Sequence, residues 1–155
     1  MDARELNDYL HRQIPLSRAM QVVVEQAALD RVVLRAPLEP NLNHRHTAFG
    51  GSIAALATLA AWALLHLRLK SQGLAPRLVI QRNAMSYERP IDAAFIATAE
   101  FADDLAWQRF LAVLHRKRRA RISVIAQVRC DGELAARFEG DFVALDEGSE
   151  VSTTK

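Results

Sequence analysis

The sequence has little of several features that would point to common classes of protein. Cys130 is its only cysteine, which excludes an intramolecular disulfide framework and a cysteine-rich zinc site, and we expect no bound metal. The formal net charge is +2, too small for a chain that binds nucleic acid through its overall charge. The first ten residues, MDARELNDYL, lack the apolar segment of a signal peptide, so we expect a cytoplasmic protein.

Apolar residues, in contrast, are plentiful. They make up 50% of the 155 residues, which is enough for a packed core and too much for a disordered chain. A chain of this length predicts one domain. We expect residues 1–146 to form it and the polar residues 147–155 to be a flexible tail.

The longest apolar segment runs from residue 53 to residue 67, and only Thr58 and His66 interrupt it. A helix that is apolar on every face is buried on every face. The uninterrupted apolar stretch is too short for a membrane span, and Arg68 and Lys70 follow closely. We therefore predict a core helix wrapped by a sheet, with His66 as a hydrogen-bonded structural residue.

Both ends of this helix carry recognisable signals. Gly50 and Gly51 precede Ser52, which we predict to be the N-cap residue. Gly73 is the expected first residue beyond the helix. Directly upstream lies a polar loop, residues 41–49, with the sequence NLNHRHTAF.

The other elements follow from hydrophobic periodicity and turn residues. Helices are expected over 3–12 and 105–115, and strands over 20–26, 31–37, 77–86, 93–101, 122–128 and 134–142. Antiparallel strands wrapped around one long helix form the hotdog architecture, an α+β fold. The sequence predicts this fold.

The hairpin between the last two strands allows a prediction of register. The apolar residues of both strands have even numbers, and directly opposed residues share a face, so opposed pairs should sum to an even number. This favours a three-residue loop, 130–132, with Arg129 opposite Glu133 and a positive φ at Gly132. The ladder would continue with Ala126 opposite Ala136 and Val124 opposite Phe138.

Three segments together resemble a known family. The first is NLNHRHTAFGGSIAALATLAAWALL and the second is YERPI. The third consists of RARI and, further along the chain, DGELAARFEGDFVAL. They are similar to the YiiD-type C-terminal thioesterase family of the hotdog superfamily, over roughly residues 6–146. The resemblance implies a homodimer or dimer of dimers that hydrolyses acyl-CoA or acyl-carrier-protein thioesters. It implies no cofactor other than the coenzyme A of the substrate.

Gly50 and Gly51 suggest a chemical role for the helix start. Backbone N–H groups there are unpaired and carry a positive partial charge, and glycine permits close approach of a substrate carbonyl. Such a pair can serve as an oxyanion hole. Ser52 beside them is a further candidate catalytic residue, and the alternative is that the glycines only allow tight packing.

Asn43 lies seven residues before the first of these glycines. Thioesterases of the phenylacetate-pathway type carry an Asn at this spacing, a His before the glycines and an Asp two helical turns beyond. Here Phe49 and Thr58 occupy the His and Asp positions. Thr58 can hold a water molecule but is a poor proton acceptor, so the base would be His44, His46 or a carboxylate of a partner subunit.

A second interpretation of the same loop is a hydratase. Glu39, Asn41 and His44 have the acid, Asn and His spacing of the hotdog hydratase motif, with Leu42 at its Pro position. A third possibility, which the missing carboxylate permits, is a protein that binds acyl thioesters without turnover.

Two further segments are candidates for substrate binding. Tyr87 and Arg89 lie in YERP, which resembles the Arg-Pro that follows the third strand in many hotdog thioesterases; the alternative is a strand end with a surface ion pair. The basic run 115–121 suggests phosphate contacts of coenzyme A by Arg118, Arg119 and Arg121, or else a solvated edge. No aromatic residues are interleaved to suggest nucleic acid.

Overall fold

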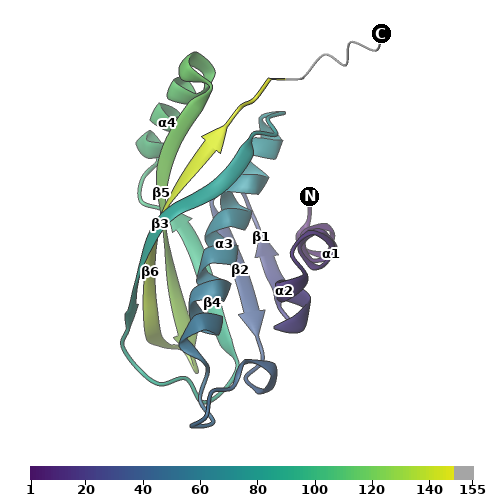
Figure 1. Cartoon of the computed structure of the whole chain (residues 1–155), viewed down its shortest axis with the longest axis vertical. Coiled ribbons are helices and arrows are strands. Elements are labelled where there is room, and N and C mark those ends of the chain that lie inside the picture. The colour runs from purple at the N-terminus through teal and green to yellow at the C-terminus, as the bar shows by residue number, and fades with distance from the viewer. Residues whose placement is uncertain (149–155) are drawn as a thin grey trace.

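A six-stranded antiparallel sheet wraps around one long helix in the computed structural model, which describes residues 1–148 (Figure 1). The strands lie side by side in the order β1-β2-β4-β5-β6-β3. Their bounds are β1 Val23–Ala27, β2 Arg31–Ala36, β3 Arg77–Tyr87, β4 Phe95–Phe101, β5 Arg119–Cys130 and β6 Glu133–Leu145. The predicted hotdog fold is thereby confirmed. Of the predicted tail, residues 149–155 lie outside the described part, whereas Glu147 pairs with Arg77 at 3.4 Å.

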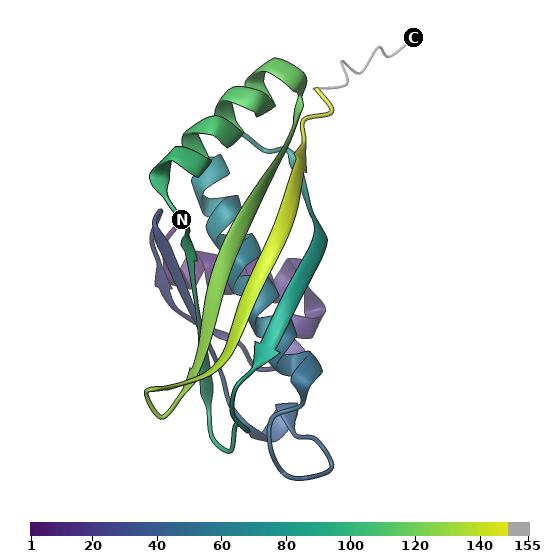
Figure 2. The same ribbon diagram turned by 90° about the vertical axis from the view of Figure 1, so that its left-hand side faces the viewer.

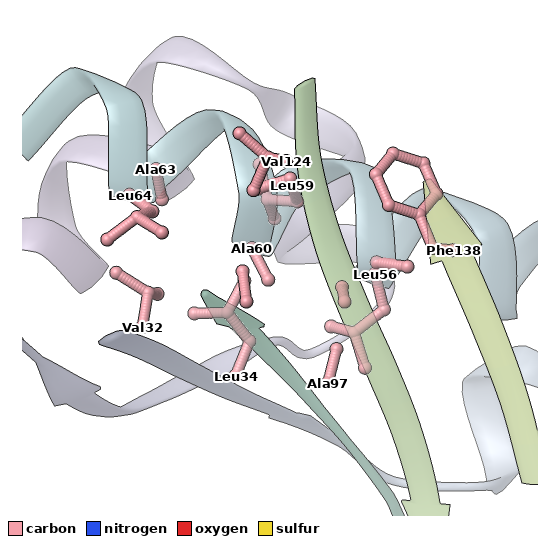
Figure 3. Close-up of a cluster of buried hydrophobic side chains, with 14 of the residues drawn as sticks. Val32, Leu34, Leu56, Leu59, Ala60, Ala63, Leu64, Ala97, Val124 and Phe138 are labelled. Atoms are coloured by element: carbon pink, nitrogen blue, oxygen red, sulfur yellow. The ribbon is translucent and has the colours of Figure 1, made fainter. Parts of the chain in front are cut away.

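The long helix, α3 (Gly50–Ser71), is the core element that the sequence predicts. Its most apolar window has a mean hydropathy of 1.6, enough by length and composition to cross a membrane, but 61% of that window is buried inside this fold. Figure 3 shows its leucine and alanine side chains meeting side chains from four strands of the sheet: Val32, Leu34, Ala97, Val124 and Phe138. The sheet therefore supplies the cover that the apolar helix requires.

The start of α3 differs from the prediction. Phe49, not Ser52, is the N-cap residue, with extended backbone angles of φ −62° and ψ 131°. Gly50 and Gly51 already lie in the helix, and no side chain caps its first turn. At the other end Gly73 has a φ of 71°, as expected for a residue just beyond a helix.

Within the described residues, three other α-helices and one short 3-10 helix, η1 (Glu39–Asn41), accompany this core. Helix α1 (Ala3–Gln13) begins with a capping box formed by Asp2 and Glu5. Pro15 is the first residue of a short helix α2 (Pro15–Ala19), which follows directly. Helix α4 (Asp104–Lys117) is capped by Asp103 and runs two residues past the predicted end.

The predicted loop of the β5–β6 hairpin is wrong. Cys130 lies opposite Glu133, so the turn has two residues, Asp131 and Gly132, with φ values of 50° and 77°. Only the positive φ of Gly132 is confirmed. An extra residue on β6, Ala135, then shifts the pairing. The observed ladder sets Val128 opposite Ala136, Ala126 opposite Phe138 and Val124 opposite Gly140.

The extra residue explains how the apolar faces still match. A two-residue turn alone would direct one strand's apolar side chains to the wrong face. Ala135 forms a β-bulge, and beyond it the residue numbers of opposed pairs again add up to an even number, so apolar residues face apolar residues. Both Ala135 and Ala136 are buried. The carbonyl of Ala135 also accepts hydrogen bonds from the N–H groups of Glu88 and Arg89, at 2.8 and 3.1 Å. The bulge thereby anchors the chain that leaves β3.

The two edges of the sheet differ in how their backbone groups are satisfied. At the β1 edge, the side chain of Asn7 in α1 accepts from the N–H of Val24, and His11 donates to the carbonyl of Val22. At the β3 edge, which Figure 2 shows beside β6, no helix lies alongside in this way within the described residues. Every residue of β3 is exposed except Leu78 and Met85, which are half-buried.

Candidate active site at the start of the central helix

The polar loop before α3 is closed by Asn43. Its side-chain oxygen accepts from the N–H groups of Arg45 and Thr47, and its amide nitrogen donates to the hydroxyl of Thr47 and to the carbonyl of Ala48. The backbone N–H of Asn43 donates to the carbonyl of Thr47 at 2.8 Å. Both ends of this side chain are thus engaged within the loop, and Asn43 holds the loop's shape.

A second asparagine fixes the loop to the rest of the fold. Asn41 is 2% exposed, and its amide nitrogen donates to the carbonyls of Met20 and Pro37. Its backbone carbonyl accepts from the N–H of Phe49 at 2.7 Å. Because the Asn41 side chain is buried against backbone, it cannot contact a substrate. The hydratase motif of Glu39, Asn41 and His44 therefore lacks an accessible Asn. His44, in contrast, is exposed on the loop.

The first two N–H groups of α3 are candidate donors to a ligand. Within residues 1–148, no hydrogen bond from the N–H of Gly50 or Gly51 is found, whereas those of Ser52 and Ile53 donate to the carbonyl of Phe49. Ser52 is thus beyond the open pair. These two donors carry the positive end of a 22-residue helix.

Two exposed aromatic rings flank these donors. The hydroxyl of Tyr87 donates to the carbonyl of Gly50 at 3.2 Å, and the ring of Phe49 covers Gly51 so closely that a Cβ there would lie 2.3 Å from it. Phe49 is 57% and Tyr87 54% exposed. A hydrophobic group of a ligand can therefore contact rings on both sides of the N–H pair.

Thr58 lies on the same face of α3 as Gly51, about two turns further on. Its hydroxyl donates to the carbonyl of Ala54 at 2.8 Å, which leaves its oxygen free to accept from a water molecule. Half-buried positions continue along this face at Trp62 and His66. The face forms the one less covered side of the helix within the described residues, between β3 and α1.

Two of the predicted substrate-binding arginines have protein partners. Arg89 forms an ion pair with Glu133 across the β6 bulge, as the surface ion-pair alternative describes. Arg118 has a φ of 59° at the end of α4, and it pairs with Asp146 at 3.3 Å. The ion pairs of Arg89 and Arg118 therefore indicate a structural role for both side chains.

The other basic residues of the run remain without acidic partners. Within the described residues, no ion pair joins Lys117, Arg119 or Arg121 to a carboxylate. All three line one hollow of about 530 Å³, together with Val113 and Val143. The hollow lies at the end of the sheet opposite to Gly50, because Arg119 begins β5 and Tyr87 ends β3.

His66 has an environment that the sequence did not indicate. Its ring stacks with those of Tyr9 and Trp62, each with centroids 4.8 Å away. Its Nε2 is buried without a hydrogen-bond partner among the described residues, so the expected hydrogen-bonded structural role is wrong. Burial, and to a lesser degree the charge of Lys70, lowers the pKa of His66 below its ordinary value.

Potential metal ligands do not gather at this site in the described part of the chain. Asp92, Cys130 and Asp131 have ligand atoms within 4.8 Å of one another, but they lie at the β5–β6 turn, and the two carboxylates are exposed. Such exposed groups commonly occur without an ion, so the geometry assigns no metal role to them.

Comparison with known proteins identifies the family. The sequence profile described as "Putative thioesterase (yiiD_Cterm)" matches residues 3–146. The chain belongs to this family. The residues matched to the YiiD C-terminal family include every helix and strand of the described part of the chain, from α1 to β6.

Solved structures agree with this assignment. A protein of unknown function from Chlorobaculum tepidum is 28% identical, with a TM-score of 0.88 over 93% of this chain and 94% of that one. A "putative thioesterase" from Shewanella oneidensis is 29% identical, with a TM-score of 0.82 and coverage of 92% and 96%. An Asn-to-Asp mutant of the phenylacetic acid degradation protein PaaI from Thermus thermophilus is 25% identical, with a TM-score of 0.61 and coverage of 84% and 98%.

Proposed function

We propose that this protein is a cytoplasmic acyl thioester hydrolase that acts on acyl-CoA or acyl-carrier-protein substrates, with no cofactor beyond the coenzyme A of the substrate. The observation that carries the proposal is the pair of open N–H groups at Gly50 and Gly51, set between the exposed rings of Phe49 and Tyr87. Membership of a family described as thioesterases supports it.

The chemistry follows from where charge develops. The thioester carbonyl oxygen accepts hydrogen bonds from the Gly50 and Gly51 amides, which stabilise the oxyanion formed when water adds to the carbonyl carbon. The Thr58 oxygen accepts a hydrogen bond from that water. His44, exposed on the loop that Asn43 closes, is our candidate for the base that takes the proton. Collapse of the intermediate breaks the carbon–sulfur bond and releases the thiol.

We propose that the active form is a homodimer paired through β3. Edge strands with free backbone groups are normally protected, and here α1 protects the β1 edge whereas β3 is left open. Val79 and Ile80 on β3 are 40% and 36% exposed. A second copy of the chain that pairs antiparallel with β3 would cover these residues and the less covered side of α3.

The alternatives make different predictions for a panel of acyl-CoA substrates. A hydrolase releases free thiol, a hydratase removes enoyl absorbance without thiol release, and a binder gains thermal stability without either change. The buried side chain of Asn41 disfavours the hydratase.

Gly50→Pro is the sharpest test of the N–H pair. Proline is favoured at the first position of a helix, and the extended backbone of Phe49 suits a residue before proline, so the fold should survive. The substitution removes one of the two donors. We expect kcat/KM to fall by about 10²- to 10³-fold, the usual cost of one oxyanion-hole donor.

Gly50→Ala is the matched control. It keeps the N–H, and its Cβ would meet Tyr87 at an ordinary contact distance of 3.6 Å. This variant should retain most activity. Equal losses in the two variants, with unchanged thermal unfolding, would show that the N–H of Gly50 is not the oxyanion donor.

A further inference from the structure

The hollow at the start of β5 carries charge of a single sign. It has a volume of about 530 Å³, and Lys117, Arg119 and Arg121 line it together with Gln81. No carboxylate is among its lining residues, whereas four other hollows of the described chain each combine acidic and basic side chains. Three positive charges therefore converge here on one concave surface.

The acidic residues that follow β6 do not neutralise this hollow. Asp146 pairs with Arg118 at 3.3 Å, and Glu147 pairs with Arg77 at 3.4 Å. Over residues 1–148, no ion pair reaches the three basic side chains of the hollow. The positive charge is thus left available to an anionic ligand.

Arg119 and Arg121 are alternate residues of β5, so their side chains leave the same face of the strand about 7 Å apart. A guanidinium group binds two oxygens of a phosphoryl group through parallel hydrogen bonds, and Lys117 at the end of α4 adds a point charge. A single phosphate ester carries only about 1.5 to 2 negative charges at pH 7, fewer than the three positive charges of the hollow. Two linked phosphoryl groups match this charge and occupy both arginines.

The remaining wall of the hollow is apolar. Val113 of α4 and Val143 of β6 line it, and Val143 is 5% exposed. The volume lies within the range of about 300 to 1,000 Å³ that is typical of small-molecule sites, and it leaves room beyond a diphosphate group. Donors on one side and apolar side chains on the other suit a diphosphate that carries an uncharged ring or chain.

The hollow and the proposed thioester site lie on opposite faces of the sheet. The even-numbered residues of β5 are buried, whereas Arg119 and Arg121 project from the exposed face, which Figure 2 shows in front of α3. Tyr87, which contacts Gly50, belongs to the row of the buried Val128. Arg121 lies seven residues further along β5, about 23 Å away. One ligand therefore does not contact both places in the same subunit.

We propose that the hollow lined by Lys117, Arg119 and Arg121 binds a small molecule with a diphosphate group, at a site separate from the thioester. The proposal goes beyond the proposed hydrolase and does not depend on it. ADP, which joins a diphosphate to an uncharged nucleoside, is the probe.

Calorimetric titration of the whole protein with ADP measures the binding directly. At constant ionic strength we expect one site per chain, and an affinity for AMP and inorganic phosphate that is at least about tenfold lower, because charge-assisted contacts are lost. Equal affinity for ADP, phosphate and sulfate would show unspecific attraction of anions and overturn the site. An acidic peptide that binds as tightly as ADP would indicate a protein-binding surface and overturn it as well.

Substitution of the two arginines tests their role. Arg119→Gln/Arg121→Gln should raise the Kd for ADP at least about tenfold. Arg119→Lys/Arg121→Lys keeps the charge but loses the paired hydrogen bonds, so its Kd should lie between those of the wild type and the glutamine variant. The matched control, Arg4→Gln/Arg18→Gln, removes two exposed arginines of α1 and α2 and should bind like the wild type. With thermal unfolding unchanged in all variants, an equal loss in the control would overturn the assignment.

Kinetics distinguish a separate ligand from the substrate, because coenzyme A also contains a diphosphate. In Arg119→Gln/Arg121→Gln the KM for acyl-CoA should equal that of the wild type, since both residues face away from Gly50. A rise in KM together with the loss of ADP binding would assign the hollow to the substrate and overturn the separate site. A wild-type protein that hydrolyses no acyl thioester contradicts the proposed function alone, because ADP binding is measured without turnover.

Discussion

Glycine at position 51 is required by its neighbour Phe49. A side chain at this position would begin 2.3 Å from the Phe49 ring, so even alanine would displace the ring from the helix start. The sequence shows two glycines at a helix start, and this supports either a packing role or an oxyanion role. In the structure Gly51 admits the aromatic ring, and its N–H has no hydrogen-bond partner among the described residues, as the proposed oxyanion role requires.

His66 should make stability depend on pH. Its pKa is lowered in the folded protein by burial and by Lys70, so the folded state binds fewer protons than the unfolded chain. Its contribution to stability is therefore full above the ordinary histidine pKa of about 6.5. It is lost as the pH falls from there toward the lowered folded pKa.

Urea unfolding at pH 8 and pH 5 measures this effect. The His66→Phe variant can keep the stack with Tyr9 and Trp62 but cannot take up a proton. Its loss of stability between the two pH values should be smaller than that of the wild type. An identical loss in both proteins would show that His66 does not contribute.

At the scale of elements, the loop before α3 acts as one unit because Asn43 engages it with both ends of its side chain. Asn43→Ala removes all four side-chain hydrogen bonds. We expect kcat to fall about 10²-fold or more, since the loop places the start of α3 and carries His44.

Asn43→Asp separates the two halves of this role. An aspartate can still accept from the N–H groups of Arg45 and Thr47 but cannot donate to Ala48. It should retain more activity than the alanine variant. Unchanged kcat/KM in Asn43→Ala, once activity is established, would exclude a role in positioning.

The β5–β6 hairpin shows what alternation along a strand predicts and what it misses. The even numbers of the apolar residues correctly predict that, along the ladder, the residue numbers of each opposed pair add up to an even number. This follows because one face of both strands is buried. The even numbers do not say where the extra residue goes. The run Leu134-Ala135-Ala136 interrupts the alternation, and this was the available signal that the bulge lies in β6 and not in the loop.

At the scale of the whole molecule, the core was predictable and the edges were not. A segment apolar on every face between residues 53 and 67 requires cover on every face, so the wrapped helix follows from the sequence. Which strand lies at an edge depends on the order of strands, and local periodicity carries no information on that. The same holds for the distance between Gly50 and Arg119, which the sequence suggested as parts of one site.

Substitution of one exposed valine in each edge strand tests the dimer. Val79 on β3 and Val23 on β1 are 40% and 50% exposed. Val79→Lys should weaken the dimer, because a charge on an edge strand opposes pairing, and activity should fall with it. Val23→Lys, on the edge that α1 protects, should leave the mass in solution unchanged. Sedimentation that shows equal behaviour of both variants would place the interface elsewhere.

The order of strands also has a consequence for synthesis on the ribosome. Strand β3 pairs only with β6, the last strand of the described chain. Until residues 133–145 have left the exit tunnel, β3 has no partner and β5 has an open side. The apolar α3 is then covered only in part, so a nascent or truncated chain exposes surface that aggregates or engages chaperones. The last strand of the sheet thus sets the moment at which the newly synthesised protein covers this apolar surface.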